Sequence, residues 1–214
     1  MRIAIFDLDG TVSRRDTFLP FVLSCVRAQP KRLCGLLRVP PALLRYVWRR
    51  DRGELKCSVI RSVLGGLTRA EMAGLGERFV ARLVPRGLFP AALDAIDGHR
   101  RAGDRLVLLS ASPDLYVPFI ARRLGFDEAI CTGVLWQMER LHGSLTTPNR
   151  RGEEKARCLQ MLRAAHPGCE IHAYGNSTGD LPHLLLADVA TLVNPHGGLR
   201  KLGTRHGVRC VEWR

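Results

Sequence analysis

The chain has 214 residues, a formal net charge of +13 and 46% hydrophobic residues. This length suits one α/β domain with an insertion, and the apolar content can fill a buried core. No apolar run reaches the roughly 18 residues that a membrane-spanning helix needs. The seven cysteines show no C-x-x-C pair, so we expect reduced thiols in a cytoplasmic protein and no zinc site. The first residues read directly as a strand, so we expect no signal peptide.

The positive charge is concentrated in one segment. Residues 13–88 carry 16 Lys or Arg against five Asp or Glu, a net charge of +11, whereas the rest of the chain carries 17 against 15, a net charge of +2. A segregated positive field attracts anions and concentrates them nearby. We therefore expect this segment to meet an anionic group or surface, unless it is only a solvated face.

The first predicted strand, residues 2–6, ends in two carboxylates, Asp7 and Asp9. Alternate side chains of a strand point to the same side, so the two lie close together and each raises the pKa of the other. A divalent cation or a proton-transfer task relieves that repulsion. Gly10 and Thr11 then form a tight turn, and the alternative interpretation is an acidic turn with a purely structural role.

Residues 13–88 lack strand alternation and are predicted to be helical. Glycine and proline positions and a capping box at Thr68 divide them. The expected helices are Phe18–Ala28, two short basic helices within 31–50 broken at Pro40 and Pro41, Glu54–Leu64, and a helix from Thr68 to about Leu83.

From Pro90 onward, helices and strands alternate. The expected helices are 91–101, 114–124, 153–166 and 181–187; the expected strands are 106–110, 129–132, 171–174, 189–193 and 208–212, with a hairpin at 133–147. This alternation predicts a parallel sheet. The carboxyl ends of its neighbouring strands should meet at one crevice.

Three further polar groups fall at predicted strand or helix ends. Ser110 and Ala111 follow a buried strand and can offer a hydroxyl and backbone N–H groups to a phosphate, although Ser110 could equally be a helix N-cap. Lys155 lies in the first turn of a helix, where a cation opposes the helix dipole, which favours a role other than that of a solvated lysine. Asn176 and Asp180 follow another apolar strand and supply oxygen ligands suited to Mg²⁺.

The pattern D-x-D-G-T at residues 7–11 resembles the first motif of the haloacid dehalogenase superfamily. Ser110, Lys155 and the segment 174–184 resemble its second, third and fourth motifs, although Asn176 stands where the fourth motif usually has Asp. The phrase Gly179-Asp180-Leu181-Pro182 is most similar to the phosphoserine-phosphatase-like group, subfamily IB. The resemblance implies a doubly wound, Rossmann-like α/β core of residues 1–12 and 89–214 with an inserted α-helical C1-type cap of residues 13–88.

The resemblance also implies a role for each motif residue. Asp7 would attack phosphorus and form an aspartyl phosphate, and Asp9 would act as general acid and base. The implied phosphate-binding residues are Gly10, Thr11, Ser110, Ala111 and Lys155, and the implied Mg²⁺ ligands are Asp7, Asp9, Asn176 and Asp180. Because the Asn176 amide brings no charge, we expect weaker metal binding than two aspartates give.

The expected function is hydrolysis of a small phosphomonoester such as phosphoserine. Asp16 lies where phosphoserine phosphatases carry an acidic residue that meets the substrate amine, but it could equally cap the helix at Phe18. The basic, leucine-rich stretch 31–50 also suits an anionic membrane surface, with phosphatidylglycerophosphate as substrate. Transfer of the phosphoryl group to an alcohol, as in a phosphotransferase, is an open alternative. The intact first motif argues against a nucleic-acid-binding module. No oligomeric state is predicted.

Overall fold

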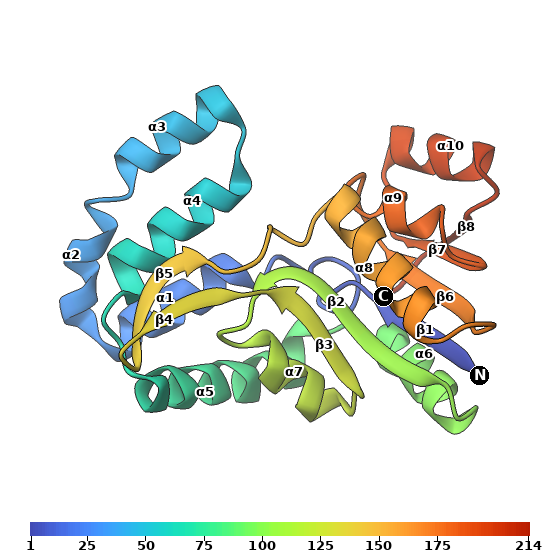
Figure 1. Ribbon diagram of the computed structural model, residues 1–214, viewed down its shortest axis with the longest axis horizontal. Helices are drawn as coiled ribbons and strands as arrows, with labels where there is room; N and C mark the ends of the chain where they lie inside the picture. The colour runs from blue at the N-terminus through green and yellow to red at the C-terminus, as the bar shows by residue number, and fades with distance from the viewer.

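The computed structural model describes residues 1–214 and contains a six-stranded parallel sheet of order β3-β2-β1-β6-β7-β8 (Figure 1). Its strands are β1 (Arg2–Phe6), β2 (Arg105–Pro113), β3 (Glu128–Thr132), β6 (Glu170–Gly175), β7 (Val189–Val193) and β8 (Arg209–Val211). Helices α6 (Pro90–Arg101), α7 (Val117–Leu124), α8 (Glu153–Ala165), α9 (Leu181–Leu184) and α10 (Gly197–Arg205) connect them. This is the doubly wound α/β core that the sequence predicted.

Both faces of the central strand β1 are covered. Ile3 and Ile5 belong to the buried cluster that includes α8 and α9, whereas Ala4 and Phe6 belong to the cluster that includes α6 and α7. A strand buried on both sides reads as a continuous apolar run, as β1 does. Its last residue, Phe6, pairs with Leu108 of β2 and Tyr174 of β6. The next residue, Asp7, therefore leaves the sheet between the ends of two neighbouring strands.

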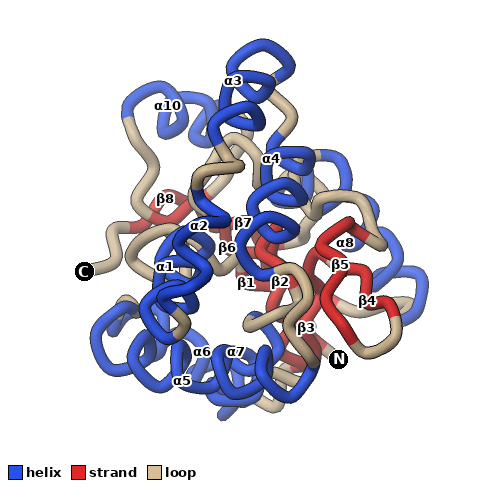
Figure 2. Tube along the Cα trace, turned by 90° about the vertical axis from the view of Figure 1, so that its left-hand side faces the viewer, coloured by secondary structure: helices blue, strands red, loops and turns tan.

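The chain between β1 and α6 is helical, as expected (Figure 2). It forms α1 (Phe18–Ala28), a 3₁₀ turn (Pro30–Arg32), α2 (Leu33–Leu36), α3 (Pro40–Arg49), α4 (Arg52–Val59) with a π-helical turn (Ile60–Leu64), and α5 (Arg69–Gly87). The prolines begin α3 because proline suits the first helical turn. Thr68 and Glu71 form the predicted capping box of α5. None of the helices in the structure combines the length and apolarity needed to cross a membrane.

A small hairpin from the second half of the chain packs on these helices. It comprises β4 (Val134–Gln137) and β5 (Arg140–Leu145), where the sequence predicted a hairpin. The amide of Leu141 donates to the carbonyl of Leu67, and the amide of Gly66 donates to the carbonyl of Leu141. The division into a core and a cap at residues 12 and 89 stays a prediction.

Several element boundaries differ from the sequence-based expectation. Strand β2 continues past Ser110 to Pro113 because Pro113 pairs with Thr132 of β3. Helix α7 begins at Val117, not Asp114, because the Asp114 amide donates to Thr132 and its carboxylate accepts the amide of Val134. Helix α9 ends at Leu184, and α5 runs on to Gly87 past the expected end at Leu83. Helix α10 was not predicted, since it opens with two glycines and buries only Gly203.

Candidate active site

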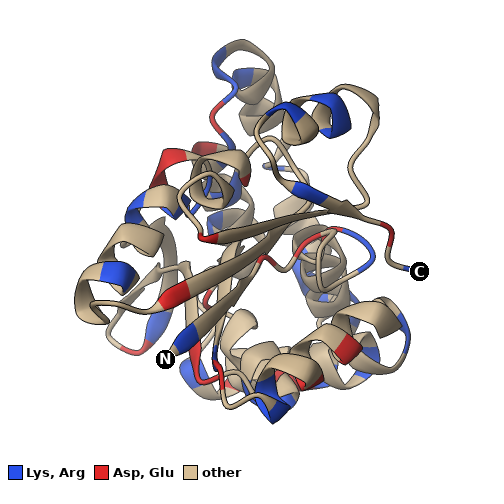
Figure 3. Cartoon of the chain, turned by 90° about the vertical axis from the view of Figure 1, so that its right-hand side faces the viewer, with Lys and Arg blue, Asp and Glu red and all other residues tan.

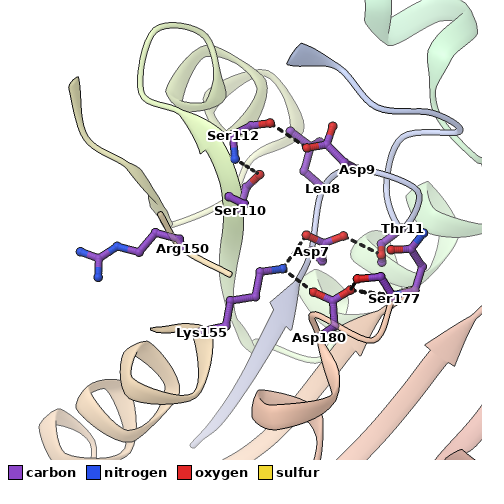
Figure 4. Close-up of polar contacts among 12 residues, drawn as sticks. Asp7, Leu8, Asp9, Thr11, Ser110, Ser112, Arg150, Lys155, Ser177 and Asp180 are labelled. Carbon is purple, nitrogen blue, oxygen red and sulfur yellow. Dashed lines mark hydrogen bonds and ion pairs between the residues drawn. The ribbon is translucent and has the colours of Figure 1, made fainter. Parts of the chain in front are cut away.

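Asp7 is the centre of a buried polar cluster at the end of β1 (Figure 4). Its Oδ1 lies 2.6 Å from Nζ of Lys155, and its Oδ2 accepts a hydrogen bond of 2.9 Å from the Thr11 hydroxyl. Burial raises the pKa of Asp7 to about 7, even though the Lys155 ammonium favours the carboxylate. Asp7 also lines a cavity.

Lys155 lies in the first turn of α8 and its side chain is 2% exposed. Its ammonium group lies 2.6 Å from Oδ1 of Asp7 and 2.6 Å from Oδ1 of Asp180. Burial alone would lower its pKa, but these two carboxylates more than offset burial and raise the pKa above its ordinary value. Lys155 is therefore not a solvated surface lysine, because it neutralises two buried carboxylates.

Asp180 closes the turn between β6 and α9. Its Oδ2 accepts hydrogen bonds from the amides of Asn176 (3.2 Å) and Ser177 (2.9 Å) and from the Ser177 hydroxyl (2.7 Å). Burial opposes the charge on Asp180, but Lys155 holds its pKa below the usual range. Asp180 is thus a fixed anion beside Asp7.

Asp9 lies two residues beyond Asp7 and is held by a different set of donors. Its Oδ1 accepts from the Thr17 amide (2.7 Å) and hydroxyl (2.6 Å), and its Oδ2 accepts from the Ser112 hydroxyl (2.7 Å). Burial nevertheless raises the pKa of Asp9. A carboxyl group that is held in place and has a raised pKa suits the role of a general acid.

Position 10 requires glycine, because of its backbone conformation and because a side chain there would have no room. Its φ is +83°, and a Cβ there would lie 2.0 Å from Nδ2 of Asn176. The turn after Asp9 therefore packs directly on the residue that replaces the usual Asp of the fourth motif.

These side chains border one cavity of about 660 Å³. The predicted site residues that line it are Asp7, Asp9, Gly10, Asp16, Ala111, Lys155, Asn176 and Asp180. Thr11 and Ser110 are fully buried and do not line it. Ser112, whose amide donates to the Ser110 hydroxyl at 3.0 Å, lines the cavity instead. The phosphate-binding role of Ser110 stays a prediction.

Asp16 serves as a helix cap in the structure. Its Oδ1 accepts hydrogen bonds from the amides of Phe18 (3.1 Å) and Leu19 (3.3 Å) at the start of α1. The helix-capping role that was the alternative for Asp16 is therefore observed. Contact between Asp16 and a substrate amine stays a prediction.

A basic wall of the cavity was missed by sequence reasoning. It consists of Arg14, Arg15, Arg52, Lys56 and Arg151. Lys56 of α4 donates to the carbonyl of Ala111 and, at 2.9 Å, to Oδ1 of Asn149, and burial lowers its pKa to about 8. Lys56 is one of only four lysines beside 29 arginines, a signal that could have singled it out.

The donor set suits a hard divalent cation. Asp7, Asp9, Asn176 and Asp180 all line the cavity and offer oxygen ligands. The structure has no group of three or more Asp, Glu, His or Cys side chains arranged to hold a metal ion. Lys155, Thr17 and Ser112 instead donate hydrogen bonds to the carboxylates. Mg²⁺ needs only one or two protein carboxylates together with water and phosphate oxygens, so these residues fit it.

Comparison with known proteins identifies the family of this chain. A model of the haloacid dehalogenase-like hydrolases matches residues 4–185. Protein CicA of Caulobacter vibrioides is 36% identical over 188 residues, which cover 87% of this chain and 83% of that protein. A probable phosphatase of Mycobacterium tuberculosis, Rv3661, is 27% identical over 95% of this chain and 72% of its own length.

Solved structures share the fold. A Bordetella pertussis protein of unknown function has a TM-score of 0.81 at 23% identity, covering 98% of this chain and 97% of that one. An aspartyl-phosphate analogue of a phosphoserine phosphatase has a TM-score of 0.65 at 14% identity, covering 98% and 92%. The predicted phosphoserine-phosphatase-like fold is confirmed. With its family model matched over most of its length, the chain belongs to the haloacid dehalogenase-like hydrolases.

Proposed function

We propose that this hydrolase is a Mg²⁺-dependent phosphatase that acts on phosphomonoesters through an aspartyl phosphate on Asp7. The observation that carries the proposal is the placement of Asp7: a buried carboxylate beside the Lys155 ammonium, open to a cavity that Asp9 also lines. An attacking carboxylate and a separate acid–base carboxyl are the two groups that this reaction needs.

The reaction proceeds in two steps on these residues. First, a carboxylate oxygen of Asp7 bonds to phosphorus while the bond from phosphorus to the ester oxygen breaks, and Asp9 gives its proton to the departing alcohol. Second, water attacks the aspartyl phosphate, Asp9 takes a proton from that water, and the Asp7–phosphorus bond breaks to release phosphate. Asp9 suits both steps because Thr17 and Ser112 hold its carboxyl group in place.

Charge neutralisation is the other requirement of phosphoryl transfer. Lys155 supplies a fixed cation, and the backbone at Gly10 and Ala111 borders the same cavity. Mg²⁺, when bound by Asp7, Asp9, Asn176 and Asp180, would screen the phosphoryl oxygens from the carboxylates. Asp180 holds Lys155 on its other side.

The cavity favours a small substrate that carries a second anionic group. Apart from Asp7, Asp9, Lys155 and Asp180, the cavity is lined by five Lys or Arg side chains and one acid, Asp16. Phosphoserine, with its carboxylate and amine, fits these charges only in part because a single acid faces five cations. We therefore place phosphorylated carboxylic acids and bisphosphates ahead of neutral alcohol phosphates.

A lipid phosphomonoester such as phosphatidylglycerophosphate is the second candidate. It is favoured by α3, because this helix supplies Tyr46 to the cavity. The residues next to Tyr46 in the sequence include exposed apolar side chains. The two candidates differ in the acyl chains, so the same assay distinguishes them.

The test is a screen of phosphomonoesters with Mg²⁺, run on the wild type, Asp7→Asn and, as a control, the exposed Asp94→Asn. We expect the wild type and Asp94→Asn to hydrolyse at least one of these substrates. The kcat of Asp7→Asn should be lower by at least about 10³-fold, while its thermal unfolding midpoint stays unchanged. Acid quenching with ³²P-labelled substrate should trap label on the wild type and Asp94→Asn but not on Asp7→Asn. Full activity in Asp7→Asn would end the proposal.

A further inference from the structure

Helix α3 exposes an unusual amount of apolar surface. Of the fifteen large hydrophobic side chains that the whole structure exposes, four lie on this one short helix. They are Leu43 (49% exposed), Leu44 (66%), Val47 (62%) and Trp48 (85%), here called the apolar face. Leu33 and Leu37, just before the helix, are exposed as well. Monomeric proteins rarely leave such a group uncovered without a partner.

The apolar face is the outer side of the helix. At 100° per residue, its four members cover one continuous arc, and the buried Ala42 and half-buried Tyr46 point away from that arc. Helix α3 contacts α4. It lies at the outer end of the helical segment, away from the six-stranded sheet (Figure 1). No element of this chain covers the apolar face.

The charges around the apolar face are positive. Residues 31–50 contain six Lys or Arg and no acid. Arg45 and Arg49 lie 3.3 and 4.0 Å from Glu54 of α4, whereas the exposed Arg38 and Arg50 form no ion pair. Tryptophan and leucine bordered by arginine are the composition of helices that lie in a membrane interface.

We propose that α3 is a docking surface for an anionic lipid bilayer, with its apolar face inserted at the headgroup level and its arginines against the lipid phosphates. A second copy of the chain is the less suitable occupant, because a two-fold contact would place these cations against themselves. Basic residues near an anionic leaflet are attracted to it. The proposal is independent of the substrate, since a peripheral enzyme can act on soluble molecules.

The test is flotation of the protein with phosphatidylcholine vesicles that contain either no anionic lipid or 30% phosphatidylglycerol. We expect binding only to the anionic vesicles, a blue shift of tryptophan emission from Trp48, and weaker binding at high salt. Leu44→Ser/Trp48→Ser should lower the partition coefficient more than tenfold and abolish the shift. Arg38→Gln/Arg50→Gln should lower the partition coefficient severalfold.

The matched control is Met161→Ser, which removes an apolar side chain from α8 whose exposed fraction, 71%, lies between those of Leu44 and Trp48. It should bind vesicles as the wild type does, and circular dichroism should show that all variants are folded. Absence of binding to anionic vesicles at low salt would overturn the proposal. So would concentration-dependent dimerisation, seen by sedimentation, that Leu44→Ser/Trp48→Ser abolishes without any effect on vesicle binding. Neither result depends on phosphatase activity.

Discussion

At the scale of single residues, the site is a set of anions arranged around one cation. Lys155 lies at 2.6 Å from both Asp7 and Asp180, all three largely buried. Burying charges is costly unless they are paired, and here each carboxylate also accepts further hydrogen bonds. The exception in the set is Asn176, whose neutral amide occupies the cavity wall next to Gly10.

Asn176 should therefore limit metal affinity. Asn176→Asp adds a charged oxygen to the donor set, and we expect it to tighten Mg²⁺ binding by roughly tenfold, since ligand charge tunes cation affinity. Isothermal titration with Mg²⁺ measures the effect without any substrate. Gln160→Glu, the same change at an exposed position of α8, is the control and should bind Mg²⁺ as the wild type does. Equal affinities in all three proteins would contradict this role.

Lys56 should make kcat/KM depend on pH in the alkaline range. Its pKa is lowered to about 8, so the side chain is charged below that pH and neutral above it. The phosphoryl group of the substrate is already dianionic there, because its second pKa is about 6. We expect kcat/KM for substrates with a second anionic group to fall as pH rises through about 8.

Lys56→Met should remove this alkaline fall and lower kcat/KM below pH 8, mainly through KM. The exposed Lys201→Met on α10 is the control and should keep the wild-type profile. Persistence of the same alkaline fall in Lys56→Met would show that another group titrates.

At the scale of elements, local sequence signals set where α5 begins. The Thr68 hydroxyl accepts the amide of Glu71 at 3.3 Å, and the Glu71 carboxylate accepts the amide of Thr68 at 2.8 Å. The helix end, in contrast, lies at Gly87, four residues beyond the expected Leu83, and α6 follows from Pro90. The start of α5 is thus marked by capping chemistry in the sequence, whereas Pro85 lies inside the helix and does not end it.

Loss of the α5 cap should be measurable. Thr68→Ala removes the side-chain acceptor, and we expect the free energy of unfolding to fall by about 1 kcal/mol. Urea unfolding followed by circular dichroism measures it. Thr204→Ala, an exposed threonine inside α10, serves as the control and should change the midpoint little. Identical losses in the two variants would mean that the cap contributes nothing specific.

At the scale of the whole molecule, the helical segment and the sheet share one hydrophobic core. A single cluster of 30 buried residues joins Phe21, Leu64 and Phe79 of the helical segment to Phe6 and Leu108 of the sheet. Basic positions outnumber acidic ones along the chain, 33 to 20 (Figure 3). The proposed division at residues 12 and 89 therefore runs through the larger cluster, whereas a second cluster of 14 buried residues lies in the sheet part alone.

We expect the chain to unfold in one cooperative transition. Since the shared cluster is exposed when either part unfolds, the two parts should lose structure together. Calorimetry should give equal calorimetric and van't Hoff enthalpies, and far-ultraviolet circular dichroism should give the same midpoint as tryptophan fluorescence. Two separated transitions would show that the helical segment is an independent unit.

The sequence by itself determined the doubly wound sheet and the positions of Asp7, Asp9, Lys155 and Asp180 at its edge. This was possible because strand period, capping residues and strand-end carboxylates are local chemistry, and because a parallel sheet brings strand ends together whatever the loops do. Only the tertiary structure decided that Ser112 lines the cavity in place of Ser110, that Lys56 of α4 reaches Ala111, and that one face of α3 stays uncovered. Those outcomes depend on contacts between residues far apart in the chain, which no local pattern encodes.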